Sequence, residues 1–169
     1  LALSGFSTLA YEALWTRLLA LVLGSTVYSF ATILAAFLTG LALGGAVVFP
    51  WVEKSRRRLE VFGFAQLGIA AWAVLVLWLY PQLPWLYVRL FAALSGRGVW
   101  LAAANAGLVF AVILPAALMM GMGLPWLARL AVRRAGERAG ADMGAAYAVN
   151  TLGAALGPWA ASFALVPLF

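Results

Sequence analysis

The longest uncharged stretch in this chain lies between Arg17 and Glu53. One membrane-spanning helix needs only ~20 apolar residues, so the stretch is long enough for two spans. Residues 24–26, Gly-Ser-Thr, are turn formers and mark the break between them. Over the whole chain 9% of residues are charged, whereas soluble domains carry about a quarter. The sequence therefore predicts an all-α fold, a polytopic transmembrane helical bundle.

The remaining apolar blocks predict three further spans and one short helix. Pro81 and Pro84 end the third span, and the aromatic and basic residues that follow are typical of a helix lying in the membrane interface. Pro115 predicts a kink in the fourth span. The five expected spans cover residues 1–23, 27–51, 61–80, 99–120 and 144–168, and the interfacial helix covers 84–94. With no initiator methionine, these residues are expected to form a single transmembrane domain of a longer protein.

Lysine and arginine gather in two of the predicted connections, residues 54–58 and 129–138. The connection after the third span holds only Arg89 and Arg97. Because cytoplasmic loops carry the excess of basic residues, both clusters and the N-terminus are expected on the cytoplasmic side. The clusters also explain the net charge of +6, so the lipid bilayer is the expected partner and nucleic acid is not.

Glu12 is the one carboxylate placed deep in an apolar segment. A charge at bilayer depth costs roughly 2.5–3.5 kcal/mol and usually faces a bundle interior, a cavity or another charge. Two interpretations stay open: Glu12 binds a cation or a proton, or a neighbouring helix holds it for packing alone. Arg17 is five residues away and does not share its helix face, so it is expected to anchor at the outer interface or to bind an anionic group. The other acidic residues lie in or beside polar connections: Glu53, Glu60, Glu137 and Asp142.

Other polar residues inside the predicted spans supply a candidate binding set. Tyr147 and Asn150 lie three residues apart on one helix face, so a polar site shared with Glu12 is a hypothesis of the sequence. The absence of cysteine and histidine removes thiol and imidazole chemistry and the commonest metal ligands. No catalytic residue, metal or cofactor is therefore predicted, and an intramembrane enzyme ranks last because Glu12 has no second catalytic group beside it. The candidate substrate-binding residues are Glu12, Tyr11, Arg17, Tyr147 and Asn150.

Small residues recur every fourth position on two of the predicted spans. They include Gly40 and Gly44 in the second span, and Gly153 and Gly157 in the fifth. Such stripes let helix backbones approach closely, so these glycines are predicted to pack helices together. Helices that slide during transport would use the same residues; plain packing is the favoured interpretation.

Several short motifs resemble the membrane portion of bacterial fused spermidine synthase-like proteins, which join a region related to half of a major facilitator transporter to a synthase-like domain. The motifs are Tyr-Glu-Ala-Leu-Trp-Thr-Arg at 11–17, Gly-Ser-Thr-Val-Tyr at 24–28, Leu-Pro-Trp-Leu-Ala-Arg at 124–129 and Tyr-Ala-Val-Asn-Thr-Leu-Gly at 147–153. The resemblance covers nearly the whole chain. One departure is that Phe49 stands four residues before Glu53, where the transporter superfamily usually has glycine four residues before aspartate.

The resemblance implies a transporter-like module in the bacterial plasma (inner) membrane, handling a cationic or polyamine-type substrate. The alternative is a non-catalytic membrane anchor or scaffold for a cytoplasmic synthase-like domain. Either role implies a partner outside these residues, the synthase-like domain or a second helical half. The family's synthase domain uses a Rossmann-like fold with substrate-binding carboxylates, and none of that is present in this sequence. An aminopropyltransferase activity is therefore not expected of this chain.

Overall fold

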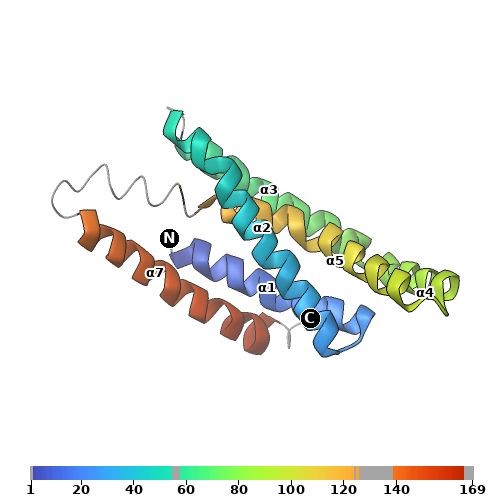
Figure 1. Ribbon diagram of the computed structural model, residues 1–169. Coiled ribbons are helices and arrows are strands. Elements are labelled where there is room, and N and C mark those ends of the chain that lie inside the picture. Colours follow the sequence, from blue (N-terminus) through green and yellow to red (C-terminus); the bar gives the residue numbers. More distant parts are fainter. Residues whose placement is uncertain (1, 55–57, 124, 126–138, 166–169) are drawn as a thin grey trace.

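The structure is a computed structural model that describes residues 2–54, 58–123, 125 and 139–165. It is all-helical, with no strand among the described residues. The helices lie roughly along one direction and form an elongated bundle (Figure 1). Their bounds are α1 Ala2–Leu23, α2 Val27–Lys54, α3 Arg58–Leu79, a 3-10 turn Tyr80–Gln82, α4 Leu83–Leu94, α5 Gly98–Gly121, α7 Ala139–Ala160 and a π turn Ala161–Leu165.

Four helical segments are long and apolar enough to cross a membrane: residues 2–23, 27–48, 60–94 and 98–121. The chain is therefore a multi-pass membrane protein by the length and composition of its helices. The fifth expected span, 144–168, is helical from 144 to 165, within α7 and the π turn, and its last residues lie outside the described part of the chain; it is not among the four. Asn150, Thr151 and several glycines lower the hydropathy of α7. The expectation of five spans stays a prediction.

The chain reverses between α1 and α2 through a turn made by local chemistry. Gly24 has a φ of +85°, a left-handed conformation that a side chain would disfavour. Thr26 then caps α2, because its Oγ1 accepts a hydrogen bond from the Ser29 backbone N–H at 3.2 Å. Glycine and a capping threonine together end one helix and start the next within three residues.

Two close helix pairs organise the bundle, and the first joins α1 to α7. A Cβ atom at Gly5 would collide with the backbone oxygen of Asn150, and a Cβ at Gly157 would collide with that of Phe6. Residue numbers rise together along this interface, so α1 and α7 run parallel. Gly153 lies against the Ala2 backbone in the same way, so both glycines expected to pack on this span lie at a helix contact.

The second pair joins α2 to α5. Gly40 lies against Ala117, and Gly44 lies against the backbone of Leu118. Gly121 of α5 lies against Leu41 of α2, so these helices also run parallel. A Cβ at Gly44 or Gly121 would collide with backbone atoms of the other helix, and a Cβ at Gly40 would collide with the Ala117 Cβ, so glycine is required at these positions.

The two parallel pairs bring four helix ends to the same end of the bundle. The C-terminal ends of α2 and α5 and the N-terminal ends of α1 and α7 lie at the same end of the bundle (Figure 1). The first basic cluster follows the end of α2, whereas residues 129–138 lie outside the described residues. The turn at Gly24 and helix α4 lie toward the opposite end.

Helix α3 is tied to α5 by a hydrogen bond from the Trp72 Nε1 to the carbonyl oxygen of Val112, at 2.8 Å. Val112 lies three residues before Pro115, within α5. Proline has no N–H and pushes against the preceding turn, which loosens the hydrogen bonding of nearby carbonyls. The carbonyl that Pro115 leaves without its helical donor is that of Ala111, so the Trp72 bond joins α3 to α5 one residue from this break.

Replacing Trp72 with phenylalanine should lower the free energy of unfolding by about 1 kcal/mol, because interhelical hydrogen bonds in membranes are worth roughly 0.6–2 kcal/mol. The measurement is denaturant unfolding of the purified protein in detergent. Trp78→Phe is the matched control, since Trp78 is 70% exposed. Equal stability of the two variants would show that the bond to Val112 contributes nothing.

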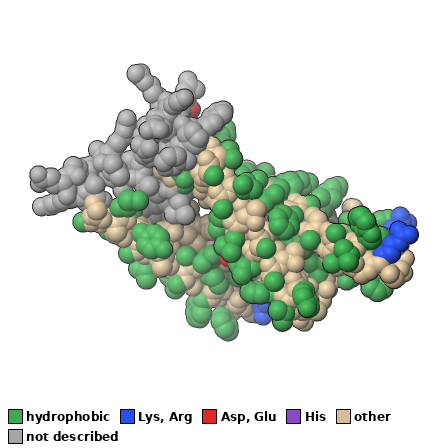
Figure 2. Space-filling view, in the orientation of Figure 1, with side chains coloured by type: hydrophobic (Ala, Val, Ile, Leu, Met, Phe, Trp, Pro, Cys, Tyr) green, Lys and Arg blue, Asp and Glu red, His purple; other side chains and the backbone are tan. Residues whose placement is uncertain are grey.

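The segment 60–94 is too long for a simple crossing. Its 35 residues would extend about 52 Å as a straight helix, whereas a bilayer with its headgroups is about 40–45 Å thick. Leu83 of α4 is buried against the core, while Trp85 is 58% exposed and carries the Arg89 guanidinium 3.8 Å from its ring centre. Figure 2 shows a group of basic side chains, among those that the structure describes, at this end of the bundle. The placement of α4 in the membrane interface stays a prediction, which these features favour.

Candidate functional site

A groove lies between α1 and α2, next to the turn that joins them. Its volume is about 390 Å³. Helices α1 and α2 each pack mainly on a different partner and make few contacts with each other, which leaves this space between them. The lining residues are Thr16, Ala20, Gly24, Ser25, Thr26, Val27, Ser29, Phe30 and Ile33.

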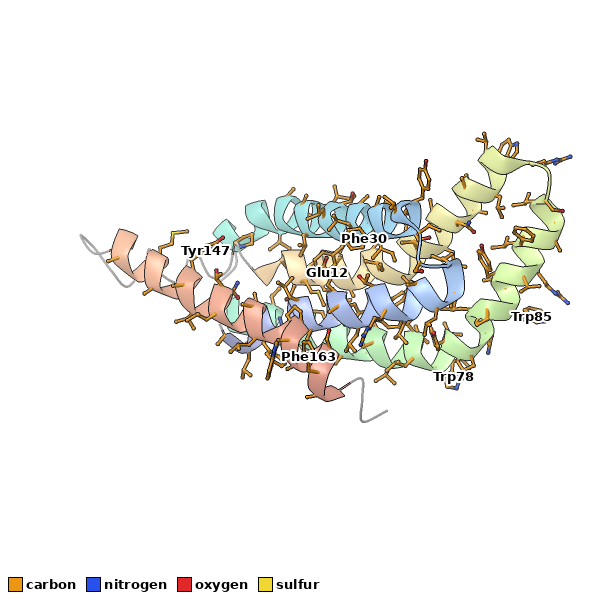
Figure 3. The ribbon with its side chains drawn as sticks, turned by 90° about the horizontal axis from the view of Figure 1, so that it is seen from below. Glu12, Phe30, Trp78, Trp85, Tyr147 and Phe163 are labelled. Carbon is orange, nitrogen blue, oxygen red and sulfur yellow. The ribbon has the colours of Figure 1, made fainter. Side chains whose placement is uncertain are left out.

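Glu12 lies one helical turn from this groove. It is four residues before Thr16 and eight before Ala20, so the three side chains follow one face of α1. The Glu12 side chain is half-buried, near the middle of the bundle (Figure 3). Within the described part of the chain, no residue forms a hydrogen bond or an ion pair with it. A carboxylate in this position has the capacity to bind a cation.

Tyr11 adds a second polar group beside Glu12. Its ring packs against Trp15, with the ring centroids 5.6 Å apart. The Tyr11 hydroxyl is buried and has no hydrogen-bond partner among the described residues. A buried hydroxyl without a partner is costly, so this group is available to a ligand or a water molecule.

The structure does not bring Tyr147 and Asn150 to Glu12. Asn150 lies against Gly5, and Glu12 is seven residues further along α1, about 10 Å away along the helix axis. Tyr147 is 67% exposed and lies in the N-terminal half of α7, away from Glu12 (Figure 3). The Asn150 oxygen atoms face the Gly5 backbone, so this residue belongs to the contact between α1 and α7.

Arg17 is exposed, and its position on α1 is about 140° around the helix from Glu12. Of the five candidate binding residues, Tyr11 and Glu12 are neighbours in α1, but their side chains leave the helix about 100° apart, and the structure gathers no shared site from the five. The groove residues Thr16, Phe30 and Ile33 were not predicted from the sequence. The recurrence of Glu12, Thr16 and Ala20 at intervals of four could have indicated one wall, but nothing local indicates that α2 supplies the other.

No family model, curated protein or solved structure matches this chain. The resemblance to spermidine synthase-like membrane proteins therefore rests on the sequence motifs quoted above.

Proposed function

We propose that this chain is a transporter-like membrane module in which Glu12 binds the cationic group of a substrate. The observation that carries the proposal is a half-buried carboxylate on a membrane-type helix, without a partner among the described residues. An ionised carboxylate in such a place is expensive unless a positive charge approaches it. A cationic substrate would supply that charge.

The position of Glu12 also supports a role in handling a substrate. It lies near the middle of the bundle, away from both ends of the helices, where a transported ion or molecule must pass (Figure 3). The neighbouring groove gives an approach between two separately packed helix pairs. The sequence resemblance makes a polyamine the first cation to test and the bacterial plasma membrane the proposed location, with the N-terminus in the cytoplasm.

Glu12→Gln should reduce the uptake of radiolabelled spermidine into proteoliposomes by at least tenfold, because the amide keeps the size of the side chain and loses its charge. Glu60→Gln is the matched control: it makes the same chemical change at the exposed start of α3 and should leave uptake within twofold of the unmodified protein. Binding of spermidine measured by equilibrium dialysis should follow the same order.

Unchanged uptake and binding by Glu12→Gln would contradict the proposal. The absence of any uptake by the unmodified protein, together with no binding of spermidine or of any other ammonium compound, would do so as well. Either result would favour the alternative function, a membrane anchor for a synthase-like domain. An anchor needs the apolar helices and tolerates any side chain at position 12 that allows folding.

A further inference from the structure

The groove between α1 and α2 is mainly apolar, although four of its lining residues carry hydroxyl groups. Its walls include Ala20, Val27, Phe30 and Ile33. The hydroxyls of Thr26 and Ser29 lie 2.9 Å apart and hydrogen-bond to each other, which leaves them less available to a ligand. A strongly hydrated molecule would find few hydrogen-bond partners in the groove. An apolar group would be removed from water or would pack against the apolar walls.

The groove and the carboxylate are adjacent. Side chains four residues apart on a helix lie about 5–6 Å from each other, so Glu12 is within reach of a molecule that touches Thr16. The groove volume of about 390 Å³ lies in the range of small-molecule sites, roughly 300–1,000 Å³. One molecule could therefore occupy the groove and contact Glu12 at the same time.

We propose that this site binds an amphipathic monocation, with its apolar body in the groove between α1 and α2 and its ammonium group at Glu12. The inference rests on the proposed cation-binding role of Glu12 and adds the substrate class. The apolar walls favour a molecule with one charge and a hydrocarbon or aromatic body. A polyamine has its charges spread along the chain, and it would place additional ammonium groups against apolar walls that offer no counter-charge.

The test compares two probes on the same purified protein in nanodiscs, with binding to empty nanodiscs subtracted. The amphipathic probe is 4-phenylbutylammonium, and the hydrophilic probe is spermidine. Ala20→Phe should fill the groove and weaken binding of 4-phenylbutylammonium at least tenfold. Ala31→Phe is the matched control, because Ala31 is exposed on α2 and does not line the groove. Glu12→Gln should weaken binding of the same probe at least tenfold.

A second groove variant keeps the test decisive if Ala20→Phe does not fold. Val27→Phe fills the groove from the α2 side, where Val27 is 82% exposed, and it should also weaken binding of 4-phenylbutylammonium at least tenfold. If both groove variants bind the probe as the unmodified protein does, or if the unmodified protein does not bind it, the inference is wrong. Spermidine binding that depends on Glu12 and not on Ala20 would then still support the proposed function. If Glu12→Gln binds both probes as the unmodified protein does, the inference and the proposed function are both wrong.

Discussion

Gly44→Ala should destabilise the bundle by about 1–3 kcal/mol, the usual effect of overpacking a close contact. An added Cβ would collide with the backbone of Leu118, and a backbone cannot move aside as the end of a long side chain can. Helices α2 and α5 would have to separate along their shared interface, which also contains Gly40 and Gly121. The measurement is the free energy of unfolding in detergent, followed by circular dichroism as denaturant is added.

Gly107→Ala is the matched control because Gly107 lies inside α5 with open space around its Cβ position. Alanine favours the helix by about 1 kcal/mol over glycine, so this variant should be unchanged or slightly more stable. The opposite signs of the two substitutions separate helix propensity from helix contact. Equal stability of Gly44→Ala and Gly107→Ala would mean that the close approach of α2 and α5 does not stabilise the protein.

The second prediction with a large expected effect concerns the labelling of introduced cysteines, each of which should react from one side of the membrane only. The chain has no cysteine, so each introduced cysteine is a unique site for a membrane-impermeant maleimide. Cysteines at Lys54 and Gly140 should react from one side of the membrane, because the end of α2 and the start of α7 lie at the same end of the bundle (Figure 1). Cysteines at Ser25 and Ser95 should react from the other side.

The side can also be predicted. The basic clusters 54–58 and 129–138 favour the cytoplasmic face, so cysteines at positions 54 and 140 should be labelled in inverted membrane vesicles and protected in intact cells. The turn at Gly24 puts the start of α1 on the same side as the end of α2, and α7 runs parallel to α1. Labelling of positions 54 and 140 from opposite sides would therefore contradict the parallel pairing of α1 with α7. Labelling of both from outside the cell would contradict only the orientation.

Much of the secondary structure was predictable because it depends on local chemistry. The long interval without charge between Arg17 and Glu53 required two helices, and turn-forming residues after Leu23 placed the break. Helix ends were less predictable. Helix α2 continues to Lys54 and α7 begins at Ala139, past the expected limits, because a helix can extend beyond its apolar part into polar residues.

The sequence alone therefore determined the helical membrane class, the reversal at Gly24 and the isolation of Glu12 among apolar residues. Only the tertiary structure decided that α1 pairs with α7 and α2 with α5, that Asn150 packs on Gly5 away from Glu12, and that a groove opens between α1 and α2. The physical reason is that helical periodicity shows which side chains share a face but not which helix covers that face. Stripes of small residues on several helices are nearly interchangeable in sequence, and the choice among them depends on how closely two particular backbones fit.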